Sequence, residues 1–388
     1  MKIALISGGY PTQQLQFLVF VQQLVEQLID LGVEVTVIAP QSIDHNIVHK
    51  EPMLPYKNIY KTKKGKEYLV FRPLFFSFSG RGGVWGYLST RTKRKGILGV
   101  LGKIRYDCIY THFWENALPV YNFCLANRTP LFVACGEGDN ALETMVETMP
   151  LSELQKLKNA VSGVISVSTE NKRKCIEFNL VNENNIAVFP NCVDDTLFYP
   201  KRNEEMRNIL GLKDDDFTVI FVGGFIHRKG PDRVAQAINK LRDNRIKSIF
   251  VGKFFDGEKV DPVCEGIVYK GVIHHDDLPA YLNAADLFVL PTLKEGCCNA
   301  IVEALACGVP VVSSNRSFNE DILNEYNSIQ VDPENVDDIA NAIARFKDDK
   351  EYYCKTKKYL LTNANGYSIT DRAKRIIDFI NLQITRIS

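Results

Sequence analysis

Apolar and polar residues in the first forty positions follow a pattern that predicts a strand, a helix and a second strand. Lys2–Ser7 is a short apolar run that ends at Gly8-Gly9-Tyr10-Pro11, where two glycines and a proline break regular structure. Large apolar residues recur every three or four positions within Phe17–Leu31, which is typical of a helix with one buried face. Gly32 ends this helix, and Val33–Ala39 follows as a buried strand. This crossover predicts parallel pairing in a doubly wound sheet.

The alternation of strands and helices continues through two successive series. Further strands are predicted at Cys108–Thr111, Leu131–Cys135 and Val164–Val167, and then at Thr218–Val222, Ser248–Val251, Leu287–Leu290 and Val309–Ser313, with helices near 231–243, 276–284 and 299–306. We therefore expect an α/β fold of two Rossmann-like, doubly wound domains that face each other across a cleft. Their predicted ranges are 1–190 and 191–369, joined at Pro190–Pro200, and an amphipathic helix at about 370–388 is expected to pack back on the first domain.

Composition and charge are those of an ordinary globular protein and exclude several classes. The formal net charge is +1 for 388 residues, so the whole chain does not indicate a nucleic-acid partner. Ten cysteines occur without a Cys-x-x-Cys pair, which favours reduced, mostly buried thiols in a cytoplasmic protein over a metal site. We expect neither a signal peptide nor a membrane span, because no apolar run is long enough. The sequence does not indicate an oligomeric state.

A glycine pair followed by two cations marks the start of the second series. The strand that ends at Val222 is followed by Gly223-Gly224 and then by Arg228, Lys229 and Gly230. Glycines let a ligand approach the backbone, and paired cations beside exposed amides suit a diphosphate. The alternative is a pair of solvated surface cations, since no Gly-Lys-Ser/Thr of a Walker loop follows.

Two acids flank a predicted helix start after the strand that ends at Leu290. Glu295 and Gly296 lie in the loop, Asn299 is a candidate N-cap, and Glu303 comes about one turn into the helix. Amides at the helix start can meet a polar or anionic ligand, and the two carboxylates can reach hydroxyl groups on either side of it. The alternative is a buried helix with incidental acids, which does not explain why acids flank an otherwise small and apolar helix start.

This segment resembles the Glu-x7-Glu signature of retaining glycosyltransferase family 4. The approach to it at Val272–Pro291, the stretch Pro190-Asn191-Cys192-Val193-Asp194 and the Gly223–Gly230 loop also resemble that family, with Cys192 in place of a glycine. The likeness is most specific between 270 and 313 and loosest between 41 and 105.

The resemblance implies the GT-B fold, with a nucleotide-sugar donor held mainly by the second domain. It implies that Arg228 and Lys229 neutralise the diphosphate, that Glu303 binds the ribose and that Glu295 binds the sugar. The donor-binding residues it indicates are Gly8, Gly9, Gly224, Arg228, Lys229, Gly271, Val272, Ile273, Glu295, Gly296, Cys297, Cys298, Asn299, Ala300 and Glu303. No metal and no cofactor are expected, because fixed cations and helix amides stabilise the leaving diphosphate.

The first domain departs from the family pattern at one position. Relatives carry a His-Gly-x-Asp stretch whose histidine reaches the donor sugar, whereas this chain has Gly136 and then Glu137 there. Glu137 is one candidate substitute, and His112, at the end of the preceding strand, is another. A histidine at a strand end is also often structural.

Two other functions fit parts of the sequence. Gly136, Gly138 and Ala141 match the glycine pattern of a dinucleotide-binding oxidoreductase. They lie in mid-domain, however, and no acid closes a strand about 20 residues later, where that motif needs one. A non-catalytic sensor of sugar nucleotides is the second alternative.

Residues 57–105 are strongly basic and interleaved with aromatic residues. They hold thirteen Lys and Arg against one acid, Glu67, and the cations are Lys57, Lys61, Lys63, Lys64, Lys66, Arg72, Arg81, Arg91, Lys93, Arg94, Lys95, Lys103 and Arg105, with Phe75, Phe76, Phe78, Trp85 and Tyr87 among them. This pattern suits an anionic membrane surface, and it would also suit nucleic acid or a solvated loop. We favour peripheral contact with the inner face of the membrane and a lipid-linked saccharide acceptor, and we expect no nucleic acid. The predicted reaction moves a hexose-type sugar, with retention of configuration, in cell-surface polysaccharide synthesis.

Overall fold

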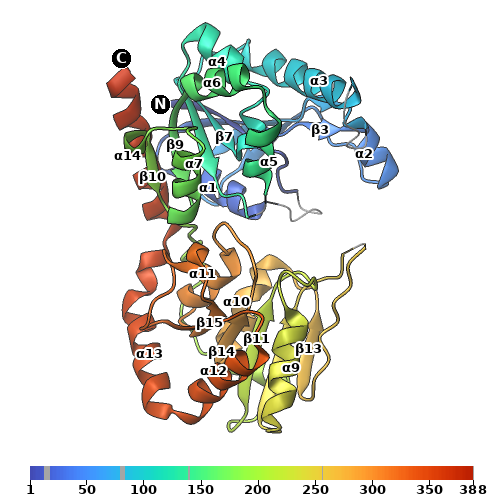
Figure 1. The fold of residues 1–388 in the computed structure, drawn as a ribbon, viewed down its shortest axis with the longest axis vertical. Coiled ribbons are helices and arrows are strands. Elements are labelled where there is room, and N and C mark those ends of the chain that lie inside the picture. The colour runs from blue at the N-terminus through green and yellow to red at the C-terminus, as the bar shows by residue number, and fades with distance from the viewer. Residues whose placement is uncertain (13–17, 79–83, 139, 256, 388) are drawn as a thin grey trace. The chain divides into compact units, whose positions relative to one another are not determined.

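The computed structural model describes residues 1–12, 18–78, 84–138, 140–255 and 257–387, and its path is drawn in Figure 1. The chain divides into two compact units, Met1–Phe189 with Thr370–Ser388, and Pro190–Ile369. The boundary expected from the sequence, between 190 and 191, lies one residue away. Phe17 of the predicted first helix, Arg81 and Asp139 lie outside the described residues, as does the side chain of Tyr87.

Unit 1 is built on an eight-stranded sheet in the order β10-β9-β8-β7-β1-β2-β5-β4. All neighbours are parallel except β4 and β5. The strand order reverses between β1 and β7, which is the switch point of a doubly wound sheet. The strands are β1 (Lys2–Ile6), β2 (Glu34–Ile38), β4 (Lys57–Lys61), β5 (Glu67–Phe71), β7 (Cys108–His112), β8 (Leu131–Cys135), β9 (Val161–Ser166) and β10 (Ile186–Val188).

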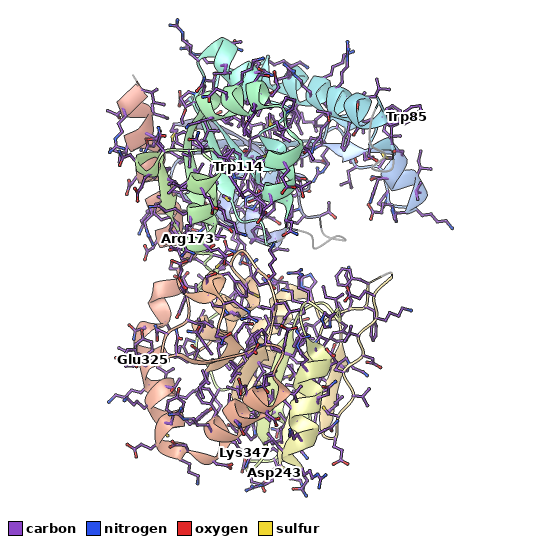
Figure 2. The ribbon with its side chains drawn as sticks, viewed as in Figure 1. Trp85, Trp114, Arg173, Asp243, Glu325 and Lys347 are labelled. Carbon is purple, nitrogen blue, oxygen red and sulfur yellow. The ribbon has the colours of Figure 1, made fainter. Side chains whose placement is uncertain are left out.

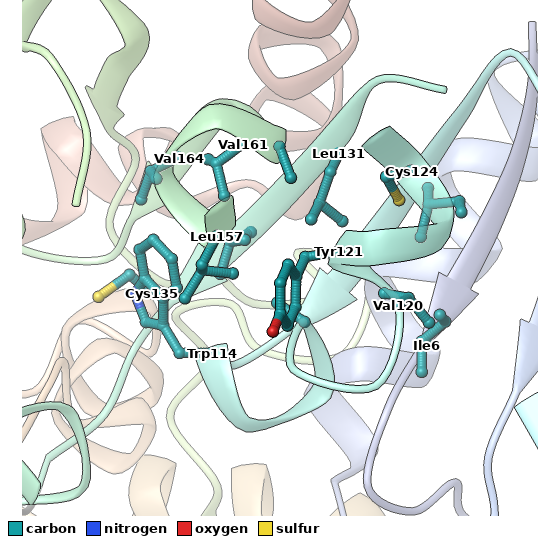
Figure 3. Packing of buried hydrophobic residues seen from close by; sticks show 14 of the residues in the cluster. Ile6, Trp114, Val120, Tyr121, Cys124, Leu131, Cys135, Leu157, Val161 and Val164 are labelled. Atoms are coloured by element: carbon teal, nitrogen blue, oxygen red, sulfur yellow. The ribbon is translucent and has the colours of Figure 1, made fainter. Parts of the chain in front are cut away.

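Helices cover the unit 1 sheet, and the apolar periodicity predicted the position of the first of them. The first, α1 (Val19–Asp30), buries Val21, Leu24, Val25 and Leu28 along one face, as expected for apolar residues three and four positions apart. The others are α2 (Ile43–Val48), α3 (Val84–Leu101), α4 (Tyr121–Asn127), α5 (Ala141–Thr148), α6 (Leu151–Ala160) and α7 (Thr169–Glu177). Beneath them, Trp114 and Tyr121 pack with small and β-branched residues of β8 and β9 in the core shown in Figure 3.

The described parts of the basic segment, 57–78 and 84–105, are largely folded into strands and a helix, so the interpretation of them as a solvated loop is wrong. The segment contains the antiparallel pair β4 and β5, the two-residue strand β6 (Leu74–Phe75), which pairs with β3 (Gln41–Ser42), and the long helix α3. Two of its cations turn inward. Arg72 is buried and donates to Asn58 Oδ1 and to the Tyr60 hydroxyl at 2.8 and 2.7 Å, and Lys93 donates to Asn116 Oδ1 at 3.2 Å.

The predicted C-terminal helix exists and packs on unit 1. It is α14 (Ile369–Ile387), and the ring of its Phe379 lies 6.3 Å from Phe132 and 6.1 Å from Phe189. Gln383 donates to the Asn184 carbonyl at 3.0 Å, so the helix is joined to the first unit by polar as well as apolar contacts.

Unit 2 has a six-stranded parallel sheet in the order β13-β12-β11-β14-β15-β16, which reverses between β11 and β14. Its strands are β11 (Phe217–Val222), β12 (Ile246–Val251), β13 (Ile267–Gly271), β14 (Leu287–Leu290), β15 (Val311–Ser314) and β16 (Ser328–Val331). Its helices are α8 (Glu204–Ile209), α9 (Pro231–Leu241), α10 (Leu278–Ala284), α11 (Asn299–Ala306), α12 (Val336–Asp348) and α13 (Lys350–Asn363). At the end far from the strands' carboxyl termini, Lys347 of α12 pairs with Asp243 at 2.9 Å (Figure 2).

Candidate functional site

The two loops singled out in the sequence leave neighbouring strands at the switch point of unit 2. One loop follows β11 and the other follows β14, and ligands of open α/β sheets bind at such a point. The backbone joins them, because the Leu293 amide donates to the Arg228 carbonyl at 2.9 Å. Arg233 of α9 also joins them, since its guanidinium donates to the carbonyls of His227 and Pro291, both at 2.9 Å.

Gly230 is required by this arrangement for two reasons. Its φ is +73°, in the left-handed region that residues with a side chain rarely adopt. A Cβ at this position would also lie 2.4 Å from Nη2 of Arg233. Glycine therefore lets the buried Arg233 guanidinium pass close to the loop and donate to both loops.

Glu295 and the paired cations meet in one cluster. Oε1 of Glu295 pairs with Nζ of Lys229, accepts from the Thr292 hydroxyl at 2.7 Å and lies 3.4 Å from Nη1 of Arg228. Arg228 also donates to the Lys294 carbonyl at 2.7 Å. The side chains of Lys229 and Glu295 are 15% and 12% exposed, whereas that of Arg228 is 43% exposed. The alternative of two solvated surface cations is therefore wrong for Lys229.

The charge of Lys229 is maintained by its neighbours. Burial alone would lower its pKa, but the nearby Cys298 and Glu295 outweigh that effect and raise the pKa above its ordinary value. Burial raises the pKa of the Cys298 thiol to about 11, so at neutral pH the thiol is uncharged and Glu295 is the anion that matters. The cluster thus keeps a fixed ammonium group in a largely enclosed place.

Helix α11 begins beside this cluster. Its N-cap is Cys298 and not Asn299, so the predicted cap is wrong by one residue, and the only side-chain acceptor that Cys298 offers to the amides of Ala300 and Ile301 is its thiol. A thiol is a weak acceptor, which leaves the first helical amides less well satisfied than serine or aspartate would. Asn191 holds the preceding turn, because its side-chain Nδ2 donates to the Cys297 carbonyl at 3.0 Å.

Glu303 lies one turn into α11, as predicted, and has a partner that the sequence did not reveal. Its side chain is 9% exposed, and Oε1 lies 2.8 Å from Nε2 of His275. His275 belongs to a 3-10 turn, His275–Asp277, that follows β13. The two residues are 28 positions apart, so no local spacing could have joined them.

The segment expected to bracket a base lies at the end of β13. The Gly252 amide donates to the Gly271 carbonyl at 2.9 Å, and the Tyr269 hydroxyl donates to the Val272 carbonyl at 3.0 Å. Val272 is 67% exposed. At the end of β11, the ring of Phe255 lies 2.7 Å from where a Cβ of Gly224 would be, so glycine makes room for that ring.

The remaining candidates belong to unit 1, at the carboxyl ends of β1, β7 and β8. Gly8 and Gly9 follow β1, and a Cβ at Gly8 would lie 3.1 Å from Oε1 of Glu115. His112 ends β7 and is buried, with the rings of Phe20 and Phe113 at 5.2 and 4.5 Å. Burial and the charge of Arg372 lower the pKa of His112 to about 3, so its imidazole is neutral.

Glu137 is already engaged in unit 1. Its two carboxylate oxygens accept from the amides of Trp114 and Gly136 at 2.8 and 2.9 Å, and its burial raises its pKa. It lines a cavity of about 290 Å³ together with Phe113, Trp114 and Met145. The carboxylate therefore orders the loop after β8, which is a role that the sequence did not suggest.

The structure thus brings together the second-domain candidates Gly224, Arg228, Lys229, Gly271–Ile273, Glu295–Ala300 and Glu303 around the carboxyl ends of β11, β13 and β14. The first-domain candidates form a separate group at the switch point of their own sheet. Within the described ranges, no cluster of three or more His, Cys, Asp or Glu side chains has the arrangement of a metal site. Nor does any helix in this part of the chain have the length and apolarity to cross a membrane.

Comparison with protein families gives two adjacent matches. Residues 19–197 match the family Glycosyltransferase Family 4, and residues 202–361 match Glycosyl transferases group 1. The two matches correspond to the two units of the structure.

Two bacterial relatives extend over most of the chain. The UDP-Gal:alpha-D-GlcNAc-diphosphoundecaprenol alpha-1,3-galactosyltransferase of Escherichia coli is 30% identical over 304 residues, which cover 74% of this chain and 78% of that protein. The putative teichuronic acid biosynthesis glycosyltransferase TuaC of Bacillus subtilis is 25% identical over 363 residues, which cover 89% of each.

Solved structures share the whole architecture at low sequence identity. Sucrose-phosphate synthase from Thermosynechococcus elongatus has a TM-score of 0.76 at 18% identity and covers 100% of both chains. Anabaena HepE, solved in complex with UDP-glucose, has a TM-score of 0.69 at 16% identity and covers 98% of this chain and 99% of its own. The chain therefore belongs to the group 1 glycosyltransferases of family 4, and its two Rossmann-like domains have the GT-B fold.

Proposed function

We propose that this glycosyltransferase moves a hexose-type sugar from a nucleotide-sugar to a lipid-linked saccharide, with retention of configuration, in cell-surface polysaccharide synthesis. The observation that carries the proposal is the cluster at the unit 2 switch point. There, Glu295 contacts Lys229 and Arg228, while Glu303 lies one turn into the helix that begins beside them.

Arg228 and Lys229 are the proposed diphosphate ligands. Breaking the sugar–phosphate bond places negative charge on the leaving diphosphate, and a fixed cation in an enclosed place stabilises that charge. Lys229 is enclosed and cationic, and Arg228 is exposed enough to meet a ligand. The reaction is therefore expected to proceed without a metal ion or a cofactor.

Glu295 and Glu303 are the proposed ligands of the two sugars of the donor. Glu295, with Gly296 and the amides of Cys297–Ala300, would bind hydroxyl groups of the transferred sugar. Glu303 would accept from the ribose hydroxyls, and Gly271–Ile273 would bracket the base. The start of α11 supports this assignment, because its N-cap is a thiol, a weak acceptor that a polar ligand can replace as partner of the helix amides.

For unit 1 we propose acceptor binding, with His112 as the first candidate for contact with the donor sugar. A neutral imidazole can donate and accept hydrogen bonds, whereas both oxygens of Glu137 already accept backbone amides. Measuring the rate of sugar transfer by His112→Gln and Glu137→Gln variants distinguishes these two candidates, and we expect the larger loss in the His112 variant. A loss confined to the Glu137 variant would reverse this preference.

A lipid-linked acceptor is supported by the Escherichia coli relative, whose name specifies an acceptor on diphosphoundecaprenol. An aromatic edge on unit 1 supports membrane contact. It consists of Phe76, Phe78 and Trp85, with the ring of Phe78 5.9 Å from Phe76 and 5.1 Å from Trp85, and Trp85 lies at the periphery of the unit in Figure 2. Helix α3, which carries Trp85, also carries the exposed cations Arg91, Arg94 and Lys95, and these suit an anionic surface.

Sedimentation with liposomes tests the membrane contact. The protein should be recovered with anionic vesicles more than with neutral ones, and Trp85→Ser should reduce that recovery. Leu151→Ser is the matched control, because it removes an exposed apolar side chain from another helix of the same unit. Equal recovery with both kinds of vesicle would contradict peripheral association through this edge. It would also contradict the proposal that the protein is a cytoplasmic enzyme that works on the inner face of the membrane.

A panel of UDP-, GDP- and ADP-sugars with a polyprenyl-diphosphate saccharide tests the activity itself. One donor should support transfer, and Glu295→Ala should abolish it, while Glu351→Ala, which removes an exposed carboxylate from α13, should leave it intact. A protein that binds a sugar nucleotide but neither hydrolyses nor transfers it would be a sensor and would contradict the proposal.

A further inference from the structure

His275 lies against the carboxylate for which the proposed function predicts ribose binding. We infer that His275 is a positioning residue, which holds the Glu303 carboxylate in the orientation that accepts hydrogen bonds from the ribose hydroxyls. The inference rests on the proposed function, because it concerns how the same donor site recognises the sugar of the nucleotide.

The contact between the two side chains is enclosed and specific. Nε2 of His275 lies 2.8 Å from Oε1 of Glu303, and the two side chains are 22% and 9% exposed. The ring of the buried Phe198 lies 5.3 Å from the imidazole and limits its rotation. Because an ionised carboxylate only accepts, Nε2 carries the proton and donates it to Oε1.

Fixing one oxygen determines what the other can do. A glutamate side chain has three rotatable bonds and loses rotamer entropy when a ligand immobilises it. The hydrogen bond from His275 provides that order before the ligand arrives, since it holds Oε1 and leaves Oε2 of Glu303 to accept from hydroxyl groups. No other hydrogen bond to this carboxylate occurs within the described part of the chain. The imidazole thereby acts on ribose recognition without touching the ribose.

The chain offers a matched control in the preceding residue. His274 lies in the same turn, but its side chain is 48% exposed and its Nδ1 faces the Asp276 carboxylate and amide at 3.6 and 3.4 Å. A His274→Ala variant therefore perturbs the same turn without removing a contact to Glu303. A His275→Gln variant keeps a side-chain donor, and a His275→Ala variant removes it.

Calorimetric binding of UDP, GDP and ADP, each compared with its 2′-deoxy and 3′-deoxy form, tests the inference. The wild type should prefer the ribose form of its nucleotide by about tenfold, as expected for hydrogen bonds to a charged group. His275→Ala should reduce this preference to within a factor of about three, while His275→Gln should restore most of it and His274→Ala should leave it unchanged. Inorganic pyrophosphate should bind all variants equally, which separates loss of positioning from misfolding of unit 2.

Each outcome has a distinct meaning. If Glu303→Gln loses the ribose preference and His275→Ala keeps it, the positioning role is overturned and the proposed donor site stands. If Glu303→Gln also keeps the preference, the ribose assignment within the proposed function fails, and the inference fails with it. If His275→Ala weakens ribose and deoxyribose nucleotides and pyrophosphate by the same factor, His275 is only structural.

Discussion

Replacing Glu295 with glutamine should separate binding of the diphosphate from transfer of the sugar. Oε1 of Glu295 pairs with Lys229 and lies 3.4 Å from Nη1 of Arg228. A diphosphate must share these two cations with the carboxylate. Glutamine keeps the shape of the side chain and removes its charge, so a diphosphate no longer competes with an internal anion.

The size of the effect follows from the exposure of the cluster. Two unit charges about 4 Å apart interact by about 4 kcal/mol at an effective dielectric constant near 20. The side chain of Arg228 is 43% exposed, so solvent strongly screens its attraction to Glu295. A bound diphosphate would also lie farther from Glu295 than the two cations do, which weakens the repulsion between the two anions. We therefore expect a net gain of about 1–2 kcal/mol, or about 5- to 30-fold tighter binding of the nucleoside diphosphate. Transfer should fall by about 100-fold, because the donor sugar loses its orienting contact.

Calorimetry with the nucleoside diphosphate, together with turnover of the nucleotide-sugar, measures both effects. Glu351→Gln serves as the charge-matched control, since Glu351 is an exposed residue at the start of α13. Weaker binding of the diphosphate by Glu295→Gln, with an unchanged midpoint of thermal unfolding, would refute the idea that carboxylate and diphosphate compete for the same cations.

Three further predictions follow from the geometry. Gly230→Ala should lower the free energy of unfolding by more than Gly211→Ala, because both glycines have positive φ but only a Cβ at position 230 would clash with Arg233. Backbone strain of about 1–3 kcal/mol is expected for either variant, and equal losses in urea denaturation would contradict the clash. Since the pKa of His112 is about 3 when folded and 6.5 in a model peptide, its protonation favours the unfolded chain below pH 6.5. His112→Asn should therefore lose about 1.6 kcal/mol less stability than the wild type when the pH falls from 6.5 to 5, and equal losses in urea denaturation at the two pH values would contradict this. Excess EDTA should leave transfer unchanged, because Arg228 and Lys229 are the proposed counter-charges, and a loss that Mg²⁺ or Mn²⁺ restores would contradict them.

Much of the fold could be predicted from the sequence because its strands are buried on both faces. Continuous apolar runs such as Leu131–Cys135 and Leu287–Leu290 coincide with β8 and β14 at every residue. By contrast, α3 was missed, because Val84–Leu101 contains glycines, threonines and cations that blur its apolar periodicity. Its position depends on tertiary packing, which a local pattern does not encode.

The candidate site shows the same division between local and long-range information. Arg228, Lys229, Glu295 and Glu303 could be selected because each lies in the loop that follows a strand or within the first turns of a helix. The contact of His275 with Glu303 could not be predicted, since β12 and β11 separate β13 from β14, the strand before α11, and only the folded unit brings the turn after β13 to this helix. Side chains that come into contact only through the tertiary fold have no characteristic spacing in the sequence by which they could be recognised.

The central claim is most directly tested by NMR of the product formed from a 13C-labelled nucleotide-sugar and a polyprenyl-diphosphate saccharide. We predict a new glycosidic bond with the same anomeric configuration as the donor, formed by the wild type and by Glu351→Ala but not by Glu295→Ala. A product of inverted configuration would contradict the retaining mechanism. An equally active Glu295→Ala variant would contradict the assignment of the site.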